Sequence, residues 1–172
     1  RIGLPDTQAW DFAASTNKVT LLARQWQLSE LVALQQSADI QAHGTLEGEL
    51  PLTVSDGRII IENGYLRALP PGGSIQYRAN DETRALAQSN PELDLALNLL
   101  RDFQYRDLNS EVELDKAGNL LLALSLAGSN PTYYEGQPIN FNINVEQNLD
   151  PLLQSLRLSD NLEEQIESSS IH

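Results

Sequence analysis

Apolar and polar residues alternate over long stretches of this chain, and a period of two residues indicates a β-strand with one buried face. The alternation is nearly perfect from Ile40 to Leu50. One face of this predicted strand carries Ile40, Ala42, Gly44, Leu46, Gly48 and Leu50. The other face carries Gln41, His43, Thr45, Glu47 and Glu49. Gly44 and Gly48 weaken this strand unless another group packs closely against them.

Two later stretches show the same alternation. One face of the first carries Leu120, Leu122, Leu124 and Leu126, and its opposite face is also largely apolar, which predicts a central strand. In the second stretch, asparagines alternate with Ile139, Phe141, Ile143 and Val145. We expect these two rows to be neighbours. Together with Ile40, Leu46 and Leu50 they would make one continuous apolar wall.

Turn signals separate the predicted strands. Asp56-Gly57 is typical of a two-residue hairpin turn, since both residues tolerate a positive φ. Asn63-Gly64 predicts a bulge or bend, and residues 69–73, with two prolines and two glycines, predict a break. Short strands joined by such turns favour a mainly β fold with an antiparallel sheet.

A few helices interrupt the strands. Asn90-Pro91 predicts a helix start, with Asn90 as the cap, and an apolar stripe of Leu93, Leu97 and Leu100 predicts that this helix lies on a sheet. Asp150-Pro151 predicts a second start, for a helix that bears Leu152, Leu153 and Leu156. Weaker signals predict a helical turn over residues 81–88 and a helix that Ser29 caps and that runs to Leu34.

Composition narrows the possible functions. The chain has 172 residues, enough for one domain with a core, and its net charge of −13 excludes nucleic acid as a partner, because phosphate binding needs clustered basic residues. The 11 basic residues are spaced singly along the sequence. Cysteine is absent, which removes disulfides and thiolate chemistry. Methionine is also absent and the first residue is Arg1, so we interpret residues 1–172 as one domain from a larger protein.

The sequence offers little for catalysis. The two histidines are His43, on the polar face of its predicted strand, and His172 at the end of the chain. They are too few for a zinc site, and the serines lie in no nucleophile motif. Glu47 and Glu49 share a strand face and could form an acid pair, although a solvated strand face explains them as well. We predict no enzyme activity, no cofactor and no metal.

Three interpretations of the apolar rows stay open. The rows could form a dry core that the two leucine-striped helices seal. They could instead line a groove that accepts an acyl chain, with the helices covering part of it. A third interpretation is a carbohydrate- or dicarboxylate-binding module with stacking aromatic residues Trp10, Trp26, Tyr133 and Tyr134. A dicarboxylate site needs clustered Arg or Lys residues, and these stand apart in the sequence.

Several blocks of the sequence resemble the YdbH family, which is related to the AsmA-like proteins and to TamB. The resemblance is carried by Gly44 to Leu52, by Asp56 to Leu66, by Pro70 to Tyr77 and by the strand-turn-strand from Phe103 to Leu126. It covers the chain from about Lys18 to Leu156.

The resemblance implies a fold and a function. Family members are long proteins anchored in the bacterial inner membrane that cross the periplasm as a curved β-sheet trough with an apolar inside. They are implicated in moving phospholipids to the outer membrane without catalysis, although an older family label speaks of dicarboxylate transport. This chain would be the C-terminal module. It would work with a small outer-membrane lipoprotein, similar to YnbE, that extends the sheet by strand addition.

Overall fold

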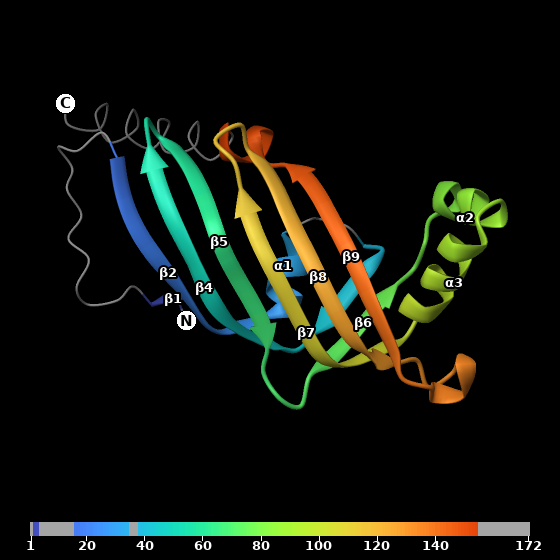
Figure 1. Ribbon diagram of the computed structural model, residues 1–172. Helices are drawn as coiled ribbons and strands as arrows, with labels where there is room; N and C mark the ends of the chain where they lie inside the picture. The colour runs from blue at the N-terminus through green and yellow to red at the C-terminus, as the bar shows by residue number, and fades with distance from the viewer. Residues whose placement is uncertain (1, 4–15, 35–37, 155–172) are drawn as a thin grey trace, which may run out of the picture.

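One antiparallel β-sheet with short helices makes up the described part of the chain (Figure 1). The computed structural model describes residues 2–3, 16–34 and 38–154. The strands are β1 (Ile2–Gly3), β2 (Thr16–Gln27), β3 (Ile40–His43), β4 (Thr45–Ser55), β5 (Arg58–Ala68), β6 (Gly73–Tyr77), β7 (Phe103–Leu114), β8 (Asn119–Ser129) and β9 (Ile139–Asn148). The helices are α1 (Leu28–Ala33), α2 (Asp81–Gln88) and α3 (Pro91–Leu100), with a short 3-10 turn at Tyr134–Gly136 and helical residues at 150–154.

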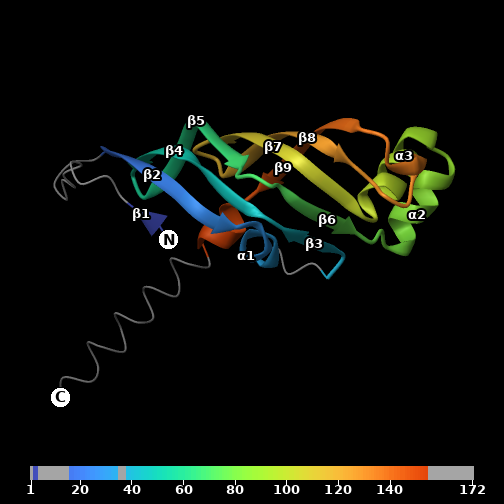
Figure 2. The same ribbon diagram turned by 90° about the horizontal axis from the view of Figure 1, so that it is seen from below.

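The strands follow one another as β1-β2-β4-β5-β7-β8-β9, with every pairing antiparallel. One edge of β7 has two partners: β6 pairs with residues 103–105, and β5 pairs with residues 109–114. The sheet therefore divides beside β7, and β3 extends the β6 branch. The sheet is not closed, and it curves into a trough (Figure 2). The prediction of a mainly β fold with a curved antiparallel sheet is confirmed.

Gly44 interrupts the strand that the sequence predicts from Ile40 to Leu50. The prediction of one strand is wrong here: β3 pairs with β6, whereas β4 pairs with β2 and β5. At the break, Gly44 adopts a φ of 136°, a conformation that favours glycine. A side chain on Gly44 would overlap the hydroxyl of Tyr105, which donates a hydrogen bond to the carbonyl oxygen of His43 at 2.8 Å.

Other groups pack closely against both glycines of this stretch. Tyr105 fills the space at Gly44. At Gly48, an added Cβ would overlap the carbonyl oxygen of Tyr65 on the neighbouring strand β5. The glycines thus let the chain bend at one point and let two strand backbones approach closely at another.

The predicted turns are also confirmed. Asp56 and Gly57 have φ values of 51° and 71° and join β4 to β5, as a hairpin turn of this type requires. Asn63 has a φ of 56°, and the register of β5 against both neighbours shifts between Ile61 and Gly64. This bulge bends β5 and adds to the curvature of the sheet.

The helix start predicted at Asn90-Pro91 is confirmed: the Asn90 side chain accepts a hydrogen bond from the backbone N–H of Leu93 at 3.2 Å. The helical turn predicted over residues 81–88 is α2, and Asn80 caps it. The cap predicted at Ser29 is wrong: α1 begins at Leu28, directly after β2, without a side-chain cap. Residues 150–154 are helical as predicted, and the continuation to Leu156 lies outside the described residues.

Helix α1 covers part of the concave side of the sheet, and α3 packs at one end of the sheet. Figure 2 shows α1 beneath the arch of the sheet, where Leu28 and Leu31 pack against its buried residues. By contrast, α3 packs with α2 and β6 at one end of the sheet (Figure 1). The predicted packing of α3 against the sheet is confirmed at β6, at the end of the trough, where Leu99 is buried and Leu100 contacts the core.

Candidate apolar groove

The concave side of the sheet carries an apolar face that crosses six strands. Cross-strand pairing joins its residues into rows: one row runs through Leu66 on β5, Ser110 on β7, Leu124 on β8 and Ile143 on β9. A parallel row joins Val112, Leu122 and Val145. We call this surface the concave face. It contains Val19, Leu21, Ala23, Trp26, Leu46, Leu50, Leu52, Val54, Ile59, Ile61, Leu66, Phe103, Tyr105, Leu108, Val112, Leu114, Leu120, Leu122, Leu124, Leu126, Ile139, Phe141, Ile143 and Val145.

Strand β7 forms the floor of the trough. Its inward side chains are buried along the whole strand: Phe103, Tyr105, Leu108, Ser110, Val112 and Leu114. Strands β4 and β5 on one side, and β8 and β9 on the other, rise as walls. Most inward residues of these walls are only partly buried. The trough is therefore deepest at β7 and more exposed toward both rims.

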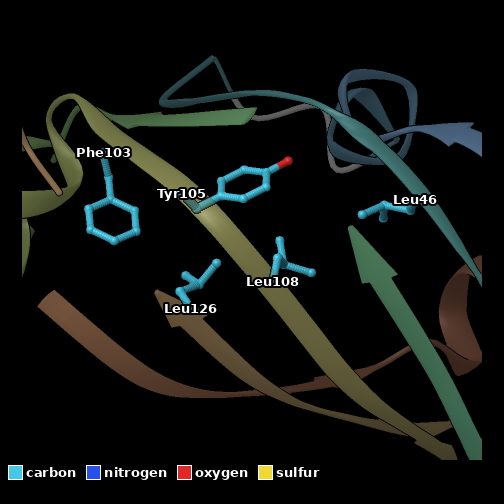
Figure 3. Close-up of a cluster of buried hydrophobic side chains, with 5 residues drawn as sticks. All are labelled: Leu46, Phe103, Tyr105, Leu108 and Leu126. Carbon is cyan, nitrogen blue, oxygen red and sulfur yellow. The ribbon is translucent and has the colours of Figure 1, made fainter. Parts of the chain in front are cut away.

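One end of the trough is filled by its own side chains. Figure 3 shows Leu46 of β4, Leu126 of β8 and three residues of β7 gathered in one cluster, in which Phe103 is completely buried. The ring of Phe141 meets Phe103 edge to face, with centroids 5.3 Å apart. Because Leu28 and Leu31 of α1 also pack here, this end is a closed core.

A hollow of about 640 Å³ lies beside the turn from β7 to β8, on the convex side of the sheet. Its lining includes Ile60 and Leu121, which alternate along their strands with the inward-facing Ile61 and Leu120. Charged residues complete much of the lining: Glu62, Glu113, Asp115, Lys116 and Glu146. The hollow is therefore a feature of the polar side of the sheet and not an opening of the trough.

The structure brings together most of the residues that the sequence nominates for a groove or core. The rows of β8 and β9 are neighbours in register, as predicted, with Leu126 opposite Phe141 and Leu122 opposite Val145. Leu46, Leu50 and Leu126 are buried. The partly buried candidates are Leu120, Leu122, Leu124, Ile139, Phe141, Ile143 and Val145. Ile40 lies apart from them on the β6 branch, opposite Tyr77.

The convex side of the sheet is polar. Glu47 lies opposite Arg67, and the Arg67 Nε donates to its Oε1 at 2.8 Å. Farther along, the Ser125 and Asn142 side chains are hydrogen-bonded across β8 and β9 at 2.9 Å. Glu47 is thus held in a cross-strand ion pair on the wet side of the sheet. This favours the solvated-face interpretation of Glu47 and Glu49 over an acid pair.

Few titratable groups in the described residues have a shifted pKa. Burial raises the pKa of Tyr105 above its ordinary value. Hydrogen bonds from the side chain and backbone of Asn119 lower the pKa of Asp115. The His43 side chain is exposed. Within residues 2–3, 16–34 and 38–154, no three His, Cys, Asp or Glu side chains are grouped as a metal site would need.

The aromatic residues proposed for ligand stacking are separated in the fold. The rings of Tyr133 and Tyr134 contact each other edge to face, with centroids 4.9 Å apart, in the loop before β9. Trp26 lies on the concave face opposite Leu46, and its buried indole N–H has no hydrogen-bond partner. Trp10 lies outside the described residues. The three described rings therefore do not form one stacking platform.

Sequence reasoning missed the floor and the filling of the trough. The inward residues of β7 begin with Phe103, Tyr105 and Leu108, whose alternation is broken by a register shift between Tyr105 and Asp107. That bulge hides the period of two in the first half of the strand. The strand β2, with Val19, Leu21 and Trp26, carries a weaker alternation that is also interrupted, between Ala23 and Trp26.

An open antiparallel sheet with an apolar concave face and a polar convex face places this chain among the trough-forming β-sheet proteins. A family model described as "YdbH-like: Intermembrane phospholipid transport protein YdbH" matches residues 4–170. The chain belongs to this family of phospholipid transport proteins, as its sequence blocks indicate. The family's role between two membranes suggests a periplasmic location.

A curated relative supports the assignment. The chain is 27% identical over 143 residues to the "Probable phospholipid transport protein YdbH" of Escherichia coli (strain K12). The match covers 83% of this chain and 16% of that relative, so the chain spans about a sixth of the relative's length. No solved structure is significantly similar to the chain. In the described residues, no helix has the length and apolar character needed to cross a membrane.

Proposed function

We propose that the concave face carries the acyl chains of phospholipids as they move between the inner and outer membranes. The observation that supports this most directly is the continuity of apolar residues across six paired strands, from β2 to β9. The family's description as an intermembrane phospholipid transport protein gives the cargo class.

The physical basis of the proposal is solvation. An acyl chain in water costs about 0.8 kcal/mol for each exposed CH₂ group. An apolar trough lowers that cost along its length without breaking or forming a covalent bond. The partly buried walls leave apolar surface available for a chain, while a phosphate headgroup stays in water outside the trough.

Within a longer protein, we place residues 1–172 as the C-terminal module of a bridge that is anchored in the inner membrane. The chain corresponds to about a sixth of its E. coli relative, so the path across the periplasm needs further segments of similar character. The closed core that α1 covers would then bound the trough at one end of this module, and the partly buried inward residues of β5, β8 and β9 would continue the path.

Cross-linking in cells tests the proposal. A photo-crosslinking amino acid is placed at Leu122 and at Phe141 in the full-length protein, where both side chains face the trough. Their chain neighbours Ala123 and Asn142 face the convex side and serve as matched controls. We expect phospholipid adducts from Leu122 and Phe141 only. Equal labelling at the control positions, or no adducts at the inward ones, would contradict a lipid path on this face.

A second candidate function concerns the edge of the sheet. In the described chain, β9 pairs only with β8, so the outer edge of a ten-residue strand is unpaired. Such an edge is a template for strand addition. We propose that a small outer-membrane lipoprotein pairs here and that the module thereby also acts as a non-catalytic docking element.

Disulfide trapping tests the docking proposal. The chain contains no cysteine, so single cysteines at Asn142 and Asn144 of β9 can be scanned against single cysteines in the lipoprotein. If the lipoprotein adds a strand, moving the cysteine by two residues along β9 should move the preferred cross-linking position in the lipoprotein by two residues. A cysteine at Asn17 of β2, on another strand, is the control. Cross-links without a register would show that the partner does not add a strand to β9.

A further inference from the structure

Three arginines from a 24-residue stretch of the sequence line one hollow at the α2–α3 end of the molecule. Arg78 follows β6, Arg84 lies in α2 and Arg101 follows α3. The hollow measures about 490 Å³ and lies between these three elements. Its lining is completed by Tyr77, Ala79, Ala87, Gln88, Asp94, Leu97 and Asn98. The turns that join β6, α2 and α3 bring these three residues to one place.

The charge of the hollow is opposite to that of the whole chain. The chain has a net charge of −13 and only 11 basic residues, three of which meet here. Asp94 is the one carboxylate in the lining, and it accepts a hydrogen bond from Asn98 Nδ2 at 3.2 Å. A local excess of positive charge in an acidic protein attracts anions to this place.

These arginines take little part in ion pairs elsewhere. Among the described residues, Arg78 and Arg101 form no ion pair. Arg84 lies 3.7 Å from Asp81, but the Asp81 side chain is fully exposed and such surface pairs contribute little to stability. Arg101 is the C-terminal cap residue of α3, where a cation is favourable, and this accounts for one of the three positions.

We propose that this hollow binds a phosphate group through Arg78, Arg84 and Arg101. A guanidinium group binds phosphate oxygens with two parallel N–H donors, and three such groups on three elements can approach a tetrahedral anion from different sides. Gln88 and Asn98 add neutral donors to the same lining. The phosphate is that of a phospholipid headgroup or a free phosphate, and both share this chemistry. The site does not require the concave face to carry acyl chains.

The test measures binding of the 172-residue chain to inorganic phosphate by calorimetry. Flotation with vesicles follows, comparing phosphatidylcholine alone with phosphatidylcholine plus phosphatidic acid. The main variant is Arg78→Gln with Arg101→Gln. The control is Arg67→Gln with Arg106→Gln, which changes the net charge equally but lies at surface ion pairs away from the hollow. All four arginines are exposed, and circular dichroism verifies that each variant is folded.

We expect the main variant to bind phosphate at least tenfold more weakly than the unchanged protein, and the control to differ by less than about twofold. Asp94→Asn removes the carboxylate of the lining and should strengthen binding, whereas Asp107→Asn, with the same change in net charge, should not. Added salt should weaken binding.

The vesicle arm identifies the source of the phosphate. Flotation only with phosphatidic acid, lost in the main variant, assigns a lipid headgroup, and phosphate binding without flotation assigns a free phosphate. Equal losses in the main variant and the control would overturn the site. So would tighter binding of succinate than of phosphate, or no binding of either phosphate or acidic vesicles.

Discussion

The hydroxyl of Tyr105 donates a hydrogen bond to the carbonyl oxygen of His43, 62 positions earlier in the chain, and this contact lies where the sheet divides. Beside it, Gly44 leaves the space that the hydroxyl occupies. The bond satisfies a carbonyl at the end of β3, just before the chain turns into β4. Tyr105 thus fixes the point where one strand leaves the β6 branch and joins the main trough.

A double-mutant cycle tests this relationship. Gly44→Ala should lower the free energy of unfolding by about 2 kcal/mol or more, because the new methyl group overlaps the Tyr105 hydroxyl and alanine disfavours a φ of 136°. Tyr105→Phe alone should cost about 1 kcal/mol. The double variant should lose less free energy of unfolding than the sum of the two single losses, because removing the hydroxyl relieves the overlap. Additive losses in urea denaturation would mean that the residues are not coupled.

Tyr105 also predicts sensitivity to alkaline pH. Burial raises its pKa above the ordinary 10.0, so the folded protein keeps the neutral phenol when the unfolded chain has begun to lose its proton. The resulting stability is fully present below pH 10 and is lost as the pH rises through the folded-state pKa. Denaturation midpoints measured from pH 8 upward should fall less steeply in Tyr105→Phe. Parallel curves for the two proteins would refute the assignment.

Leu126 and Leu121 in β8 offer a matched pair across the sheet. Leu126 is 3% exposed in the closed core, and Leu121 is 39% exposed on the convex side. Leu126→Ala should reduce the free energy of unfolding by about 2–5 kcal/mol, because it leaves a cavity between packed side chains. Leu121→Ala should reduce it by less than about 1 kcal/mol. If denaturant titration gave similar losses for both, the buried cluster would not be the stabilising core.

Asn130 connects α3 to the loop before β9. Its side chain is 1% exposed, and its Nδ2 donates to the carbonyl oxygens of Asn98 and Leu99 at 3.2 and 3.0 Å. Asn130→Ala leaves buried carbonyls at the end of α3 without these donors, at a cost of about 1–3 kcal/mol each. A thermal scan should show a clear drop in Tm. Asn140→Ala, on the exposed side of β9, is the control and should leave Tm nearly unchanged.

The lowered pKa of Asp115 predicts that the protein loses stability at acidic pH. Its pKa is lowered, first of all by the Asn119 side chain, whose Nδ2 donates to Oδ2 at 2.9 Å. The associated stability is present above the ordinary value of 3.8 and is lost as the pH falls through the lower folded-state pKa. Carboxyl NMR titration should place the Asp115 midpoint below 3.8. In Asn119→Ala, the midpoint should move upward, and an unchanged midpoint would show that Asn119 is not the cause.

Local rules explain how much of the fold the sequence reveals. The alternation around Leu122 and Phe141 predicts which side chains face inward, since successive residues of a strand point to opposite faces. Asp56-Gly57 and Asn90-Pro91 predict a turn and a helix start from backbone preferences alone. These features depend on residues within a few positions of each other, and the structure confirms them.

Contacts between distant segments explain what the sequence could not reveal. The break at Gly44 depends on Tyr105, and the covering of one end of the trough depends on Leu28 and Leu31 of α1, a helix with a weak signal of its own. Helix α3 packs against β6, so it covers one end of the sheet and not the length of the trough.

The sequence by itself determines that this chain forms an antiparallel sheet with one apolar and one polar side, because alternate residues of a strand point to opposite faces. It also determines family membership, through the order of short blocks. Only the tertiary structure decides that β7 is the floor of a trough, that one end is closed, and that Arg78, Arg84 and Arg101 meet at a single hollow. The reason is physical: which strands pair, and which loops meet, depends on packing between residues that are dozens of positions apart.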